Sequence, residues 1–299
     1  MKVTICTPTY NRENCLNRLY ESLKTQKCYD FEWVVVDDGS TDNTEILIKE
    51  FSEKEHNFPI KYIKKINGGK HTALNVGVNS ASGKYFLIVD SDDFLGENAV
   101  EMVIECFENV PENYAGIAFY KMFVDGKLVG TSFDGEYIDA TSLERPKYNI
   151  NGDKAEVFFT DVLKKYPFPV FAGERFLPEA TVWNRIANDG YKLRWFNKGF
   201  YYCEYQPDGL SMTANVFTSF KGYTLFIREL NSYKKTSLIE RIKNTGVYAY
   251  NAKKMSLSNK EIRNNISVNG LFLFTSKILY SIKIKLFHSL RKEKLNVRE

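Results

Sequence analysis

The chain has 299 residues, of which 43% are hydrophobic and 26% charged, which is the composition of a globular protein with one substantial core and room for a helical appendage. No segment approaches the ~18 uninterrupted apolar residues of a membrane-spanning helix, so none is predicted. The net charge of +4 is small, and the core shows no basic, aromatic-laced face, which argues against nucleic-acid binding.

Strand and helix patterns alternate through the first third of the chain. Strands are predicted at 3–6, 32–36, 60–66 and 85–89, the second and fourth of them buried, and three segments with apolar residues at helical spacing separate them. This alternation predicts an α/β fold with a doubly wound, mostly parallel, Rossmann-like sheet flanked by helices.

The second half is less regular. Its predicted elements are a strand at 117–124 with a hairpin turn at Asp125-Gly126, a short helix at 155–163, a helix from Glu179 to Gly190, a strand region at 193–205 and helices from about 217 onward.

Four polar loops follow the four predicted strands of the first third. Right-handed crossovers place the carboxyl ends of parallel strands at one edge of the sheet, so the loops should converge there. They are Thr7–Arg12, Asp37–Asp42, Asn67–His71 and Asp90–Asp93. The convergence predicts a site for a nucleotide.

The last of these loops holds Asp90, Asp92 and Asp93 directly after a buried apolar run. Carboxylates this close repel one another and stay ionised only if a cation or fixed donors neutralise them. Their oxygens suit Mg²⁺ or Mn²⁺, with positions left open for phosphates. The alternative is an acidic turn in which Asp93 or Asn98 caps the next helix.

Read together, these stretches resemble the family 2 glycosyltransferases, which are inverting enzymes of the GT-A fold. The matching segments, in chain order and at usual spacing, are Thr7–Arg12, Val36–Asp42, Gly68–Asn75, Ala81–Tyr85, Asp90–Asp93 and Trp183–Arg185. The resemblance implies a GT-A domain over residues 1–212, with a nucleotide-binding half at about 1–96 and an acceptor half at about 97–212. Residues 213–299 would form a helical extension.

The resemblance implies metal-dependent transfer of a sugar from a nucleotide sugar, with UDP as the first nucleotide to test, to a glycan or lipid-linked glycan in cell-surface polysaccharide synthesis. Asp92 and Asp90 would hold Mn²⁺ or Mg²⁺. The implied donor-binding residues are Thr7, Pro8, Thr9, Tyr10, Arg12, Asp38, Lys70, Asp90, Ser91 and Asp93. For Asp38 the alternative is a structural turn, and for Lys70 it is a solvated surface lysine.

The catalytic base is expected to be Glu179. An inverting transfer needs a carboxylate to take the proton of the attacking hydroxyl. The family usually places an Asp, preceded by a Glu, shortly before the Trp-x-Arg of this helix, whereas here those positions hold Glu179 and Pro178. Glu174 is the rival base, and simple stabilisation of the helix terminus is the alternative role of Glu179.

Two later segments add expectations. The stretch from Tyr205 to Ser211 resembles a family loop that closes over the donor. Farther on, apolar residues at helical spacing lie among lysines and arginines, which predicts a basic amphipathic helix on an anionic membrane surface. They are Leu271, Phe274, Ile278, Ile282, Leu286 and Leu290. Packing of this helix on protein is the alternative.

Five cysteines without a CxxC pair predict neither a disulfide framework nor a zinc site. With no signal-peptide pattern, this indicates a cytoplasmic location, with the C-terminal helix on the inner face of the membrane. The sequence is compatible with a monomer and with an oligomer.

Two other functions are compatible with the same sequence features. A nucleotidyltransferase would share the sheet and its acidic edge, but usually carries a glycine-rich basic loop after the first strand, which Thr7–Tyr10 lacks. A non-catalytic nucleotide-sugar-binding module would have no need of Glu179.

Overall fold

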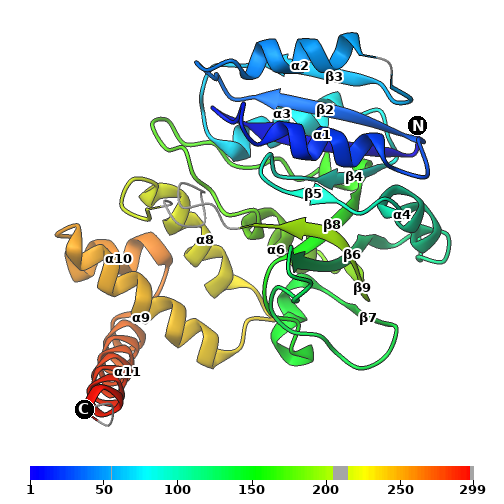
Figure 1. The fold of residues 1–299 in the computed structure, drawn as a ribbon. Helices are drawn as coiled ribbons and strands as arrows, with labels where there is room; N and C mark the ends of the chain where they lie inside the picture. The colour runs from blue at the N-terminus through cyan, green and yellow to red at the C-terminus, as the bar shows by residue number, and fades with distance from the viewer. Residues whose placement is uncertain (55, 205–214, 297–299) are drawn as a thin grey trace. The chain divides into compact units, whose positions relative to one another are not determined.

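The computed structural model describes residues 1–54, 56–204 and 215–296, and no side chain beyond residue 283 (Figure 1). The chain forms two compact units, Met1–Ala214 and Asn215–Glu299. The first unit is an α/β domain and the second is helical, as the sequence predicts.

Four parallel strands form one half of the sheet in the first unit. They are β1 (Val3–Thr9), β2 (Phe31–Asp37), β3 (Ile60–Lys64) and β4 (Tyr85–Ile88), in the spatial order β3-β2-β1-β4. The connecting helices are α1 (Leu16–Lys24), α2 (Thr44–Glu53) and α3 (Lys70–Ser80). The predicted doubly wound arrangement of these strands is confirmed, so their carboxyl ends share one edge.

The other half of the sheet mixes parallel and antiparallel pairs. Its strands are β5 (Phe94–Leu95), β6 (Tyr114–Phe123), β7 (Tyr137–Ala140), β8 (Lys154–Phe159) and β9 (Lys192–Cys203). Strand β8 runs antiparallel to β4 and to β6, whereas β6 and β9 are parallel. The helical segments of this half are α4 (Ala99–Phe107), the 3₁₀ helix η1 (Ser142–Tyr148), α5 (Thr160–Leu163) and α6 (Ala180–Asn188). The nine-stranded sheet as a whole is therefore mixed, and the prediction of a mostly parallel sheet holds only for its first half.

The predicted helix at 155–163 is wrong. Residues Lys154–Phe159 form β8, and only Thr160–Leu163 are helical. Val157 and Phe158 pair with β4 on one side and β6 on the other, so the segment is a central strand. A short apolar run cannot be assigned to helix or strand from periodicity alone, and here the two neighbouring strands decide.

Successive residues of β2 enter two different cores, one on each face of the sheet. Trp33 and Val35 of β2 pack with the apolar faces of α1, α2 and α4. Val34 and Val36 pack with α3, α5 and α6 on the opposite face. Burial on both faces explains why β2 reads as an unbroken apolar run rather than an alternating one.

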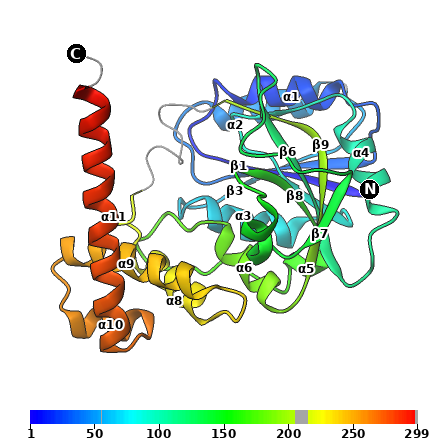
Figure 2. The same cartoon turned by 90° about the horizontal axis from the view of Figure 1, so that it is seen from below.

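The second unit consists of α8 (Phe220–Ser232), α9 (Leu238–Lys254), α10 (Asn259–Ile266) and α11 (Gly270–Asn296), which Figure 2 shows as a long helix. Its core surrounds Tyr248 and Ile262, both fully buried. Capping boxes begin α9 and α10, with Ser237 and Ser258 as the N-cap residues. In the described part of the chain, none of the helices combines the length and apolar character that crossing a membrane would require.

Candidate active site

Lys70 links two of the predicted functional segments by ion pairs. It is the first residue of α3, and its Nζ lies 2.6 Å from Asp90 Oδ1, after β4, and 2.8 Å from Glu179 Oε1, at the start of α6. The side chains are only partly exposed, which strengthens the attraction. The predicted convergence of the polar loops is therefore present, and it extends to the predicted base.

These ion pairs fix the charge states of Lys70 and Asp90. Burial alone would lower the pKa of Lys70, but the carboxylates of Asp90 and Glu179 outweigh it and raise that pKa well above its usual value. Burial likewise would raise the pKa of Asp90, yet Lys70, aided by Lys121, holds it below the ordinary value. At neutral pH the site thus contains the ammonium of Lys70 beside the ionised carboxylate of Asp90.

Asp38 fixes the glycine turn that precedes Lys70. Its two carboxylate oxygens accept hydrogen bonds from the backbone N–H groups of Gly68 (2.9 Å) and Gly69 (2.6 Å), and Lys65 Nζ lies 2.5 Å from Oδ1. Asp38 is almost completely buried. Its carboxylate is therefore largely engaged in positioning the turn at Gly68 and Gly69, a structural role different from the local turn and helix cap considered from sequence. A nucleotide contact by Asp38 stays a prediction.

Tyr201 of β9 holds the acidic turn, Asp90–Asp93, by hydrogen bonds. The Tyr201 hydroxyl donates to Asp93 Oδ2 (2.7 Å) and accepts a hydrogen bond from the backbone N–H of Asp90 (3.0 Å). Burial and the nearby Asp90 raise the pKa of Asp93 to about 7. Tyr201 thus ties both ends of the Asp90–Asp93 turn to the sheet.

Replacing Tyr201 with Phe should loosen this turn without opening a large cavity. Both hydrogen bonds are lost, and each is worth about 1 kcal/mol or somewhat more where a charged group takes part. We expect the Kd of a metal–nucleotide complex to rise roughly five- to thirtyfold, as measured by calorimetric titration. The matched variant Tyr202→Phe, on the same strand, should bind as the wild type does; equal affinities of all three proteins would contradict the positioning role.

The donor set at Asp90 and Asp92 fits a divalent cation. Burial and the charge of Asp90 raise the pKa of Asp92, a conflict that a bound cation would relieve. Asp92 forms no ion pair with any residue that the structure describes, whereas Asp90 is paired with Lys70. Over the same residues, no cluster of three or more His, Cys, Asp and Glu side chains could hold a metal. Such a site would resemble Mg²⁺ sites that use one or two carboxylates and complete their shell with water and phosphate oxygens.

The first loop contributes less exposed surface than the sequence suggests. Thr7 and Pro8 are buried in β1, and Thr7 Oγ1 accepts a hydrogen bond from Trp33 Nε1 (2.9 Å), so its side chain is a core contact. Thr9 Oγ1 is buried and has no hydrogen-bond partner within the described chain. Tyr10 is 44% exposed.

Two other predicted donor residues lie close to the acidic turn. The positive charge of Arg12 lowers the pKa of Asp92, against the effects of burial and Asp90, so this charge lies near the acidic turn. Ser91 is buried within that turn.

Glu179 and Glu174 are separated by their surroundings. Glu179 precedes the first turn of α6, where the carbonyl of Glu179 accepts from the N–H of Val182, and its carboxylate contacts Lys70. Glu174 lies in the preceding loop, and its charge acts on His71. The contact with Lys70 favours Glu179 as the residue facing the donor loops, although its role as the base stays a prediction. The predicted closing loop from Tyr205 to Ser211 lies outside the described residues.

Several residues of the site had no sequence signal. Lys121 of β6 is buried, pairs with Asp153 (2.8 Å), and places positive charge near Asp90 and Asp93. Arg18 of α1 donates a hydrogen bond to the carbonyl of Asp92. Tyr201 lies in the predicted strand region at 193–205, which forms β9, but the sequence assigned it no role in the site. Each of these residues lies at the site because of the order of the strands or the packing of a helix, and local sequence patterns do not predict either.

The chain is similar in sequence to known proteins. The sequence model of glycosyl transferase family 2 matches residues 4–166. Glycosyltransferase GlyA of Streptococcus pneumoniae is 31% identical over 228 residues, covering 70% of this chain and 31% of GlyA. The minor teichoic acid biosynthesis protein GgaB of Bacillus subtilis is 27% identical over 248 residues, covering 81% of this chain and 27% of GgaB. This chain thus spans less than a third of the length of either relative.

A solved structure shares the fold. The structure of Staphylococcus aureus TarS residues 1–349 in complex with UDP-GlcNAc superposes with a TM-score of 0.65 at 22% sequence identity, covering 92% of this chain and 82% of that one. The α/β domain with its helical extension is therefore of the GT-A type, as predicted. The family model and the relatives define the class as a glycosyltransferase. The chain belongs to glycosyl transferase family 2.

Proposed function

We propose that this protein transfers a sugar, with inversion, from a nucleotide sugar to a hydroxyl group of a glycan acceptor. The observation that carries the proposal is the convergence of Asp90, Lys70 and Glu179, which joins the donor edge of the sheet to a carboxylate on the acceptor half. UDP is the first nucleotide to test, because UDP-GlcNAc is bound to the structurally similar TarS. The name of GgaB supports an acceptor from cell-surface polymer synthesis.

In this proposal each charged residue has one task. Glu179 takes the proton of the acceptor hydroxyl as that oxygen forms a bond to the anomeric carbon. The bond from this carbon to the phosphate oxygen breaks on the opposite side, and its electron pair leaves with the nucleoside diphosphate. Lys70 would exchange its ion pairs for the diphosphate. A divalent cation held by Asp92, with Asp90, would supply charge stabilisation to the leaving group.

The test is a panel of nucleotide sugars with Mn²⁺ or Mg²⁺, in which release of nucleoside diphosphate is measured. We expect release with at least one donor. Metal-dependent binding without release, also in the presence of glycan acceptors, would instead favour the binding-module alternative. Release of pyrophosphate from a nucleoside triphosphate and a sugar phosphate would favour the nucleotidyltransferase.

We also propose that α11 lies on an anionic membrane surface. Its apolar residues Leu271, Phe274 and Ile282 are 74%, 62% and 49% exposed, while Leu273 and Ser276 on the opposite side are buried. Lys277 and Lys283 flank this exposed face. Apolar exposure beside lysines suits the headgroup region of anionic lipids.

Replacing Leu271 and Phe274 together with Ser should weaken membrane binding. The wild-type chain is expected to sediment with vesicles of phosphatidylglycerol and phosphatidylcholine at low salt. The double variant should bind about tenfold more weakly or worse, since each buried side chain contributes roughly 1.5–3 kcal/mol. Ser substitutions at the exposed Ile46 and Ile66 of the first unit serve as the matched control. The proposal would be contradicted if the wild type, the double variant and the control variant sedimented equally with the vesicles, or if the wild type did not sediment with them at all.

A further inference from the structure

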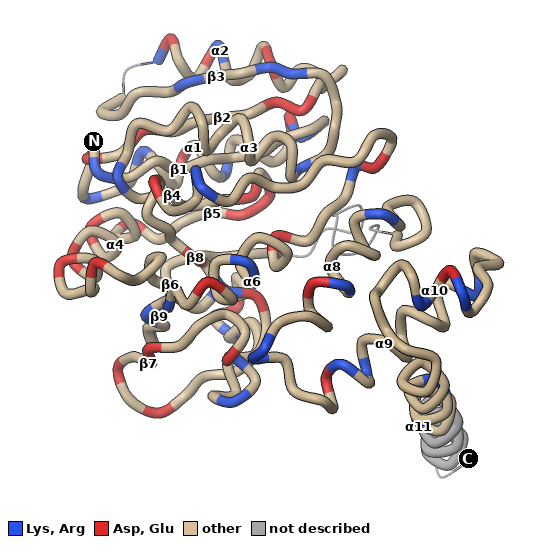
Figure 3. Tube along the Cα trace, turned by 180° about the vertical axis from the view of Figure 1, so that it is seen from behind, with Lys and Arg blue, Asp and Glu red and all other residues tan. Residues whose placement is uncertain are grey.

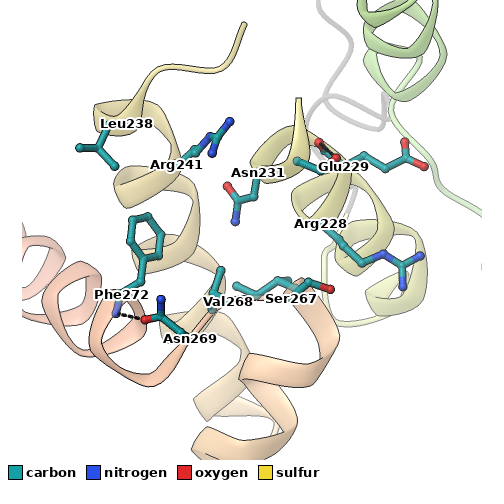
Figure 4. Close-up of a pocket in the computed structure, with 11 residues that line it drawn as sticks. Arg228, Glu229, Asn231, Leu238, Arg241, Ser267, Val268, Asn269 and Phe272 are labelled. Atoms are coloured by element: carbon teal, nitrogen blue, oxygen red, sulfur yellow. Dashed lines mark hydrogen bonds between the residues drawn. The ribbon is translucent and has the colours of Figure 1, made fainter. Parts of the chain in front are cut away.

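A cavity of about 500 Å³ opens among the helices of the C-terminal unit (Figure 4). Residues of α8, of the start of α9, and of the turn between α10 and α11 line it. Its volume lies within the range of small-molecule sites. None of the residues that line it has a catalytic or donor-binding task in the proposed sugar transfer.

Two polar side chains on its wall have unmet hydrogen-bonding capacity. Arg241 donates through Nη2 to the carbonyl of Tyr233 (2.8 Å), and Asn231 donates through Nδ2 to Thr245 Oγ1 (3.0 Å). Arg241 Nε and Asn231 Oδ1, however, are buried without a hydrogen-bond partner among the described residues. Buried unsatisfied polar atoms are costly, so their presence on a cavity wall suggests a partner that is bound there.

The rest of the wall combines an aromatic ring with a second amide. Figure 4 shows Phe272 and Asn269 around the same space as Arg241 and Asn231, whereas Arg228 extends away from it. Asn269 Oδ1 accepts a hydrogen bond from the backbone N–H of Phe272 (2.8 Å) and so caps α11, which leaves the Asn269 amide nitrogen as a donor. A ring and amides suit a ligand with an apolar face and several hydroxyl groups.

The charge of the unit that holds the cavity favours an anion. Residues 215–299 hold 17 of the chain's 41 Lys and Arg but only five of its 37 Asp and Glu, and Figure 3 shows basic residues on α8 and α10. The single acid on the wall, Glu229, accepts a hydrogen bond from the Tyr233 hydroxyl (3.1 Å). A guanidinium with free N–H groups is well suited to a phosphate.

We propose that this cavity binds a sugar or polyol unit that carries a phosphate group. Arg241 holds the phosphate, the amides of Asn231 and Asn269 bind hydroxyl groups, and Phe272 packs against the carbon face. If the proposed transfer is correct, the ligand is a unit of a phosphate-bearing acceptor; that role rests on the proposed function, whereas the binding itself does not.

The test uses the full chain with three probes: glucose 1-phosphate, glucose and inorganic phosphate. Calorimetric titration gives their affinities, and hydrogen–deuterium exchange locates the bound probe. We expect glucose 1-phosphate to bind at least about tenfold more tightly than either other probe, because only it reaches both the guanidinium and the ring. Exchange should slow in peptides covering 226–242 and 266–273.

Three variants make the test specific. Arg241→Met and Asn231→Asp should each weaken glucose 1-phosphate binding by about tenfold or more, the second by placing a carboxylate beside the phosphate at nearly unchanged volume. Lys260→Met removes the same charge from an exposed position of α10 away from the cavity and should bind as the wild type does. Unfolding temperatures show whether each variant is folded. If Arg241→Met does not fold, Asn231→Asp still tests the proposal.

The contrary results are distinct. Absence of protection, equal binding of inorganic phosphate, or unchanged binding by both cavity variants would overturn the proposal. Protection confined to peptides around Lys70 and Asp90 would overturn it while leaving the proposed transfer intact. Protection at the cavity in a protein that releases no nucleoside diphosphate would support the cavity and refute the transfer.

Discussion

Glu179→Gln is expected to lower the rate of sugar transfer by about a thousandfold, within the 10²–10⁴ range of general-base catalysis. The amide cannot accept the proton of the acceptor hydroxyl, but it can still accept a hydrogen bond from Lys70, which lies 2.8 Å from the native carboxylate. Donor binding should therefore stay within about threefold of the wild-type value, as for a group that acts mainly in the transition state.

The decisive measurement pairs kcat with the Kd of the donor nucleotide. Glu174→Gln is the matched control, because it makes the same change five residues earlier in the same segment, and it should retain most of the activity. A large loss in Glu174→Gln together with an active Glu179→Gln would assign the base to Glu174. Full activity of both variants would remove the carboxylates of this segment from the mechanism.

Asp92→Asn is expected to lower kcat/KM by roughly a hundredfold or more and to abolish stimulation by Mn²⁺ or Mg²⁺. A bound cation contributes several kcal/mol of charge stabilisation to the leaving diphosphate, and an amide is a poorer ligand than a carboxylate. Asp92 is the expected ligand because Asp90 is already paired with Lys70. A chelator should bring the wild-type protein to about the activity of the variant.

The control for Asp92→Asn is Asp161→Asn, which removes one negative charge from an exposed position of α5 and should leave activity unchanged. An Asp92→Asn enzyme that retains full activity and metal stimulation would show that Asp92 does not hold the cation.

The first half of the fold follows from local pattern. Strand β2 could be read from its apolar run, and its ending in Asp37-Asp38 places polar residues at the sheet edge. Strand β8 could not be predicted from the sequence, because Val157 and Phe158 become strand residues only through pairing with β4 and β6, which are distant in sequence. Propensity is a weak guide where tertiary pairing decides.

The same division applies to the site. The resemblance indicated Asp90, Lys70 and Glu179, and topology brings them into contact. Tyr201 and Lys121 could not be found, because their strands reach the acidic turn only through the spatial order of the sheet. The hydrogen bonds from Gly68 and Gly69 to Asp38 could not be predicted either, since a buried carboxylate that fixes a turn has the same local sequence as one that binds a ligand.

Gly69 limits how this enzyme could be re-engineered. A side chain there would begin 2.0 Å from the carbonyl oxygen of Arg175, and the backbone φ of +93° already disfavours other residues. Even alanine would clash with the backbone of Arg175, so the turn before Lys70 or the segment before Glu179 would have to shift. A chimera that combines this nucleotide-binding half with another acceptor half would therefore need to keep glycine at position 69, and screening at that position should yield few working enzymes.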